Sequence, residues 1–279
     1  MLQYKTILSS ALALVLMTSP LFAQSPSPQA TTSDQPLEIS ADKALEWDRT
    51  NRKYFARGNA IAKQGDMQVE ADTLVADYRD TNGRTEIYKF TASGNVVLTS
   101  GANKAYGENA TYEVDAGKAV LTGKDLRIEA PEMKLTAQER FEYYANDGKM
   151  VAIGSPVITN NDSTLKADQI TAWTADKSDI SKADNSQLKN LKRAEAYGNV
   201  VITTPKEKAT ADKGVYTGDN DTVELTGKVK LMQGPNTLEG IRAEMNLTTN
   251  LSKMYGDPKK GGRVKGVFFP SSQKSGGKS

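Results

Sequence analysis

Gly94-Asn95-Val96-Val97 returns later in the chain as Gly198-Asn199-Val200-Val201, and Gly58-Asn59-Ala60-Ile61 is a third version of it. Each version joins a Gly-Asn pair, which is a strong turn signal, to small or β-branched residues that favour a strand. A chain that repeats this join is expected to consist of many short strands separated by tight bends.

Two other elements recur between these tetrapeptides. Leu121-Thr122-Gly123-Lys124 returns as Leu225-Thr226-Gly227-Lys228, and an Ala-Asp pair occurs at 71–72, 167–168 and 211–212. The units restart after about 30 residues, a period typical of stacked arrays. The polar stretch 176–193 breaks this rhythm, and we interpret it as a surface loop inserted in one unit.

Within the units the apolar residues alternate with polar ones. Residues 67–72 and 241–247 both follow this period of two, which is typical of a strand with one buried face. Residues 136–144 could pass for a short helix, but their place in the repeat favours a strand. We therefore predict an all-β fold with two facing antiparallel sheets, apolar between them and charged outside.

The composition excludes several kinds of chemistry. The 279 residues include no cysteine and no histidine, so Ser-His-Asp and Cys-His catalysis and ordinary zinc and copper sites are excluded. The net charge of +2 gives no strong attraction to nucleic acid. We expect no cofactor, no metal and no enzymatic activity.

The two ends of the chain differ from the middle. Lys5 and the apolar run Ile7 to Met17 predict a signal peptide, cleaved after Ala23. Residues 24–36 are rich in Ser, Pro, Thr and Gln and predict a flexible linker, and residues 271–279 predict a disordered basic tail. The folded domain is then expected to cover 37–270.

Both ends of this predicted domain, together with the repeats, resemble the LptA/OstA family of periplasmic lipopolysaccharide-transport proteins. Residues 35–42, Gln-Pro-Leu-Glu-Ile-Ser-Ala-Asp, are similar to the first strand of that family, and residues 262–271 to its last strand. The Gly-Asn-Val-Val and Ala-Asp elements are similar to its internal repeat. The resemblance covers nearly the whole mature chain, and this chain is longer than usual by about one repeat.

The resemblance implies a twisted β-jelly roll, open along one side and at both ends, in the periplasm of a Gram-negative bacterium. It implies that lipid A acyl chains lie between the sheets, with Leu37 and Ile39 in contact and Ser33 ahead of them. It also implies head-to-tail stacking, both with copies and with jelly-roll partners at the inner and outer membranes. The expected docking edges are residues 37–41 and 264–268, with Val264, Val267 and Phe268 in the second.

Alternation along the strands suggests further inward-facing candidates for lipid contact, namely Trp47, Phe55, Val69, Phe141 and Trp173. Residues of this kind could instead simply fill a lean core. Likewise, the lysines and arginines after residue 258 could contact lipid A phosphates or could form a solubilising tail.

Two other functions are compatible with short repeated strands. One is a β-solenoid enzyme that degrades polysaccharides with carboxylates, and the other is a structural or adhesive surface array. The enzyme should gather polar and aromatic residues on one outer face, whereas Asp and Glu are scattered evenly along this chain.

Overall fold

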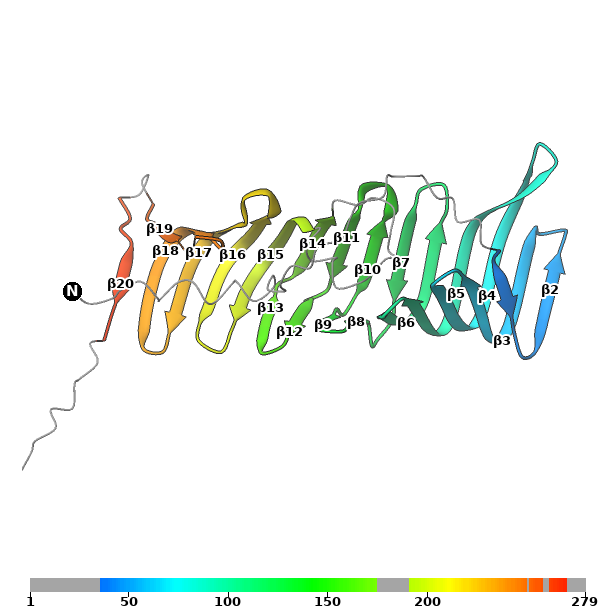
Figure 1. Cartoon of the computed structure of the whole chain (residues 1–279), viewed down its shortest axis with the longest axis horizontal. Coiled ribbons are helices and arrows are strands. Elements are labelled where there is room, and N and C mark those ends of the chain that lie inside the picture. Colours follow the sequence, from blue (N-terminus) through cyan, green and yellow to red (C-terminus); the bar gives the residue numbers. More distant parts are fainter. Residues whose placement is uncertain (1–35, 175–190, 250, 258–260, 270–279) are drawn as a thin grey trace, which may run out of the picture.

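The computed structural model describes residues 36–174, 191–249, 251–257 and 261–269. Their strands form a single hydrogen-bonded sheet of 20 strands, interrupted only by turns and two short 3-10 segments (Figure 1). The all-β prediction is confirmed. Within these ranges, no helix has the length and apolar character needed to cross a membrane.

Two groups of four consecutive strands, β3 to β6 and β15 to β18, are long, and all the others are short. Their bounds are β1 Glu38–Ser40, β2 Ala44–Asp48, β3 Lys53–Gln64, β4 Met67–Thr81, β5 Arg84–Ser100, β6 Asn103–Glu113, β7 Lys118–Thr122, β8 Arg127–Ala130, β9 Met133–Thr136, β10 Arg140–Tyr144, β11 Lys149–Ile153, β12 Val157–Asn160, β13 Ser163–Lys166, β14 Gln169–Thr174, β15 Leu191–Thr203, β16 Lys208–Thr217, β17 Thr222–Gln233, β18 Asn236–Asn246, β19 Leu251–Tyr255 and β20 Lys265–Val267. The 3-10 segments are Ala145–Asp147 and Gly218–Asn220.

Each long strand bends in its middle and contributes to two half-sheets. The β2 half-sheet runs in the order β2, β3, β4, β5, β6, β7, β10, β11, β14, β15, β16, β17, β18, β19, and the β1 half-sheet in the order β1, β3, β4, β5, β6, β8, β9, β12, β13, β15, β16, β17, β18, β20. All pairs are antiparallel. Between β6 and β15 the two half-sheets use separate strands, so the pairing closes a ring of ten strands there.

The bends of β3, β5 and β15 fall at the Gly-Asn pairs, and the corresponding bend of β17 falls at Gly227-Lys228. Arg57 pairs with Thr73 and Ala60 with Ala71, so Gly58 and Asn59 together oppose the single residue Asp72. Two residues opposite one is a β-bulge, which bends the strand. All the bends follow one line, which we call the seam, and the seam joins the half-sheets along the length of the molecule.

Side chains brace the seam. At Gly94-Asn95 both residues have positive φ, and the Asn95 side-chain amide donates to both carboxylate oxygens of Asp72 at 3.1 Å. The same contact recurs between Asn199 and Asp168, at 3.2 and 3.0 Å. The Ala-Asp element thus supplies the acceptor for the next Gly-Asn bend, so two motifs distant in the sequence form one structural unit.

The core lies between the half-sheets. Leu121 and Phe141 of the β2 half-sheet and Leu135 of the β1 half-sheet belong to one buried cluster in the first half of the molecule. A second cluster in the other half joins Ile170 to Ile202 in the same way. The half-sheets therefore face each other with their apolar sides.

One sequence expectation needs correction, and another is confirmed. Residues 191–193 were predicted to belong to the inserted loop, but they are paired within β15, while 175–190 lie outside the described residues. The ambiguous stretch 136–144 contains the end of β9 and all of β10 and is not a helix.

We predict that Gly94→Ala destabilises the protein more than Gly83→Ala. Both glycines have positive φ, which costs an L-residue about 1–2 kcal/mol. A Cβ at Gly94 would also lie 2.1 Å from the Asp72 Oδ2 atom, whereas nothing lies within 4 Å of a Cβ at Gly83. Urea unfolding of the two variants measures the difference, and equal losses would show that the Asp72 contact does not restrict the bend.

Candidate functional site

The inner surface has a continuous apolar floor. In each half-sheet one row of cross-strand neighbours carries only aliphatic, aromatic or glycine residues, from one end of the molecule to the other. The β2 floor row is Leu45, Ala56, Leu74, Ala92, Ala110, Leu121, Phe141, Ala152, Ile170, Ala196, Gly214, Leu225, Ala243 and Met254. The β1 floor row is Ile39, Ala62, Val69, Leu98, Ala105, Ile128, Leu135, Ile158, Leu165, Ile202, Ala209, Leu231, Leu238 and Gly266.

The next inward-facing position of each strand lies two residues farther from the seam. The residues at this position differ in character between the two half-sheets. In the β2 half-sheet this position forms an aromatic rim of Trp47, Tyr54, Ala76, Phe90, Tyr112, Ala119, Tyr143, Met150, Ala172, Ala194, Tyr216, Val223, Met245 and Ser252. In the β1 half-sheet it is mostly polar, and we call it the polar rim; its members are Leu37, Gln64, Met67, Ser100, Asn103, Ala130, Met133, Asn160, Ser163, Thr204, Glu207, Gln233, Asn236 and Phe268.

The aromatic rim begins with three rings at the β2 end. The Trp47 and Tyr54 rings stack with centroids 5.6 Å apart, and the Tyr54 and Tyr78 centroids are 4.9 Å apart. The Trp47 indole donates to the Tyr78 hydroxyl at 2.9 Å, and the Arg49 guanidinium lies over the Trp47 ring. Stacked and hydrogen-bonded rings of this kind hold a fixed geometry at an otherwise open edge.

Farther along the same rim, Tyr216 shows how the polar ends of these rings are satisfied. Its hydroxyl donates to the Asp221 carboxylate at 3.2 Å. Burial and that neighbouring carboxylate raise the pKa of Tyr216 to about 12. The phenol therefore stays neutral, and its ring can face an apolar interior.

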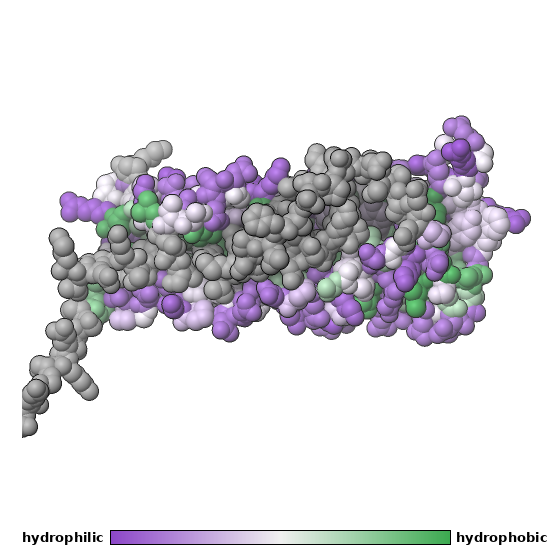
Figure 2. Space-filling model, viewed as in Figure 1, coloured by the Kyte–Doolittle hydropathy of each residue, from purple (hydrophilic) through white to green (hydrophobic). Residues whose placement is uncertain are grey.

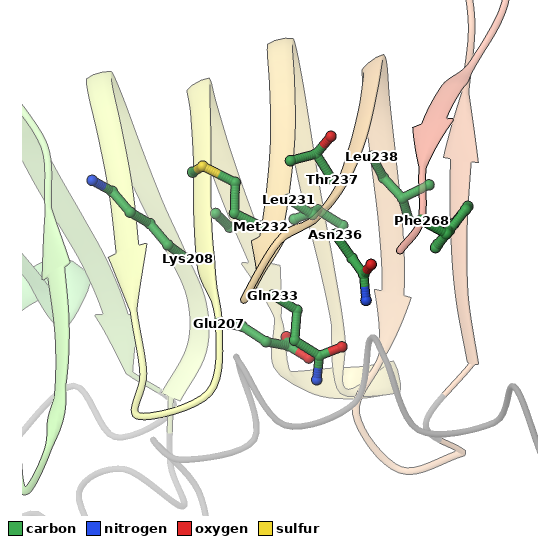
Figure 3. Close-up of a pocket in the computed structure, with 10 residues that line it drawn as sticks. Glu207, Lys208, Leu231, Met232, Gln233, Asn236, Thr237, Leu238 and Phe268 are labelled. Carbon is green, nitrogen blue, oxygen red and sulfur yellow. The ribbon is translucent and has the colours of Figure 1, made fainter. Parts of the chain in front are cut away.

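Cavities lie along the polar rim. A shallow hollow of about 410 Å³ surrounds the β8–β9 turn, and a narrow cavity of about 20 Å³ lies near β20. Figure 3 shows Glu207, Gln233 and Asn236 of the narrow cavity on one side of the strands, with Leu238 and Phe268 beside them. Burial raises the pKa of the Glu207 carboxyl.

Large apolar side chains are exposed at both ends. At the β1/β2 end Leu45 is 62% and Trp47 is 53% exposed, and at the other end Leu251 and Phe268 are similarly open. Figure 2 shows hydrophobic residues gathered toward each end of the molecule, with hydrophilic residues along the upper and lower borders of this face. The apolar floor thus continues to the last described strand at each end of the sheet.

The predicted lipid-contact residues are distributed unevenly. Ile39 and Val69 lie in the β1 floor row, Phe141 lies in the β2 floor row, and Trp47 lies in the aromatic rim. Leu37 precedes β1 and is 36% exposed. Ser33 lies outside the described residues.

The inward orientation predicted for Phe55 and Trp173 is wrong. Phe55 pairs with Glu46, and Trp173 pairs with Lys149 and Arg193, in rows on the outer face. The alternation along these strands was assigned to the wrong face, because Ala56 and Ala172, next to them in sequence, are the residues that face inward.

The predicted docking residues lie at sheet edges. Ile39 is in β1, Val267 is in β20, and Val264 and Phe268 flank β20. Val264, Val267 and Phe268 are each at least 40% exposed.

The polar rim was not predicted from the sequence. Its signal is the polar residue two positions beyond the floor residue in several strands, as in Leu98 and Ser100.

Comparison with known proteins agrees with these features. The family model described as "LptA/(LptD N-terminal domain) LPS transport protein" matches twice, at residues 38–139 and 134–251. An uncharacterised protein of Rhizobium meliloti (strain 1021) is 31% identical over 131 residues, covering 42% of this chain and 70% of that protein.

Among solved structures, a match is found to LptH of Pseudomonas aeruginosa, described as the LptA-homologous periplasmic component of the lipopolysaccharide transport device. It has 13% identity over 85% of this chain and 98% of that chain, with a TM-score of 0.21, so it adds no weight to the assignment. The two family matches together cover most of the chain, and on that ground the protein belongs to the LptA/(LptD N-terminal domain) family of LPS transport proteins.

Proposed function

We propose that the protein carries lipopolysaccharide by sheltering its acyl chains between the two half-sheets. The observation that carries this proposal is the pair of uninterrupted apolar floor rows, which face each other along the whole sheet. A floor of this length with no charged residue in it is suited to hydrocarbon chains rather than to a soluble substrate.

The energetics favour such a shelter. Moving one methylene group from water into apolar surroundings is worth about 0.8 kcal/mol. A chain of a dozen carbons therefore costs on the order of 10 kcal/mol to expose, which strongly disfavours free diffusion through an aqueous compartment. Binding on an apolar floor removes that cost without any chemical step, in keeping with a transport family rather than an enzyme.

The proposed location is the periplasm, in keeping with the predicted signal peptide and with the family match. There the chain would bridge inner- and outer-membrane components through its two open ends. Strands β2 and β19, each of which pairs with a single neighbour among the described residues, are edge strands of the kind that can accept a further antiparallel strand.

Two residues of the β2 floor row, one inside the sheet and one at its edge, indicate what an added strand would cover. Phe141 in β10 occupies the same floor row as Leu45 in β2, and β7 pairs beside it. Phe141 is 4% exposed, whereas Leu45, with no strand beyond it among the described residues, is 62% exposed. A partner strand beside β2 would bury Leu45 as β7 helps to bury Phe141.

Photocrosslinking tests the lipid proposal. A photoreactive residue at Val69 or Ile39, both in the β1 floor row, is expected to form a lipopolysaccharide adduct in living cells. The same residue at Ile61, which lies on the outer face beside Ser40, is the control and is expected to form none. Adducts of equal yield at the inner and outer positions, or none at the inner ones in folded protein, would contradict the proposal.

Cysteine pairing tests the end-to-end contact. If β19 of one copy pairs with β2 of the next in line with the existing rows, Lys253 of one copy faces Glu46 of the other, with opposite charges. Because the chain has no native cysteine, Glu46→Cys combined with Lys253→Cys is expected to give a ladder of disulfide-linked multimers on a non-reducing gel.

The matched control moves one cysteine away from the edge. Lys89→Cys combined with Lys253→Cys places one thiol in β5, inside the β2 half-sheet and away from the edge. The disulfide-linked products of this variant should therefore not extend beyond dimers. A ladder of the same length from this control would show that the contact is not specific to the edges.

A further inference from the structure

The polar rim of the β1 half-sheet holds most of the polar side chains that the fold buries. The described residues include seven buried polar or charged residues, and Ser100, Asn160, Ser163 and Thr204 of this rim are four of them. Each lies two residues from a floor residue and so points to the same inner face. Their burial is thus a property of the interior and not of the outer surface.

Two oxygen atoms of this rim have no hydrogen-bond partner among the residues that the structure describes. They are the Ser163 hydroxyl oxygen and the Glu207 Oε1 atom, both with almost no exposed area. Ser163 as a whole is 9% exposed. Leaving a buried polar group unpaired costs about 1–3 kcal/mol, so native proteins rarely retain such groups without use.

Other members of the rim are held in place by the fold. The Asn160 side-chain oxygen accepts from the Asn161 amide at 3.0 Å, and the Thr204 hydroxyl accepts from the Glu207 backbone N–H at 3.1 Å. At the β20 end the Asn236 side-chain oxygen accepts from the Phe269 backbone N–H at 2.8 Å. These contacts fix the rim, and the two unpaired oxygens remain for a guest.

The facing aromatic rim contributes none of the buried polar residues found in the described part of the chain, although Tyr54, Tyr112, Tyr143 and Tyr216 carry hydroxyl groups there. It is made of aromatic, aliphatic and alanine side chains, with Ser252 at its last strand, and the Tyr216 hydroxyl is already bonded to Asp221. A guest between the half-sheets therefore meets buried Ser, Thr and Asn side chains on the side of the polar rim and mainly rings and aliphatic groups on the other. The interior is amphipathic across its width as well as apolar along its length.

We propose that the polar rim binds the hydroxyl, amide and ester groups at which the acyl chains of the cargo join its head group. With these groups at the polar rim, the chains lie on the floor and the head group leaves over the β1 half-sheet. This orientation rests on the proposed function, because it requires an acylated lipid between the half-sheets.

The test compares two fluorescent probes of equal chain length. One has its chain joined through an amide with a hydroxyl beside it, and the other has a plain hydrocarbon link. We expect the double variant Ser163→Ala, Glu207→Leu to lose about tenfold in affinity for the first probe, the loss of two ordinary hydrogen bonds, and none for the second.

The controls separate binding from folding. Thr164→Ala changes the neighbouring residue of β13, which faces outward, and should bind both probes as the wild type does. Ser163→Ala alone removes an oxygen that has no partner, so it should melt as the wild type does while losing a smaller part of the affinity for the first probe.

The possible results distinguish failure of the polar-rim proposal from failure of the proposed function. Unchanged binding of the first probe by the double variant, or equal losses for both probes, would overturn the polar-rim proposal while the proposed function stands. A wild-type protein that binds neither probe nor lipopolysaccharide would overturn the proposed function and the rim with it.

Discussion

The bend at each Gly-Asn pair is the constraint on which the molecule depends. Two residues with positive φ turn the strand, and an aspartate from another strand fixes the turn through the asparagine amide. Because every bend lies on the same line, one polypeptide supplies both half-sheets with their apolar sides facing. Without these bends the long strands would form one flat sheet with an apolar face open to water.

This constraint explains why the fold could be predicted from the sequence. The Gly-Asn signal, the Ala-Asp element and the period-two alternation are local features, and each has one structural meaning here. The family resemblance agreed with them at both ends. The predicted end of the inserted loop was three residues too late, because Leu191-Lys192-Arg193 is polar at its end and yet pairs within β15.

The site was harder to predict. Ile39, Val69 and Phe141 were correctly given an inward face, but Phe55 and Trp173 were not, since an aromatic ring can lie on a sheet's outer face beside charged groups. Arg57 lies over the Phe55 ring in this way. The polar rim cannot be recognised from the sequence of any single strand. It becomes a feature only when pairing aligns residues as distant as Ser100 and Asn236 along one border.

Pairing between neighbouring strands also determines the length of the molecule. Each strand bonds only to its immediate neighbours in its half-sheet, and strands in a sheet lie about 4.8 Å apart. A hairpin inserted or removed between two bends would therefore lengthen or shorten the body by about 10 Å without changing any other contact. The length of a protein of this build can therefore change in steps of one hairpin while the rest of the fold is kept.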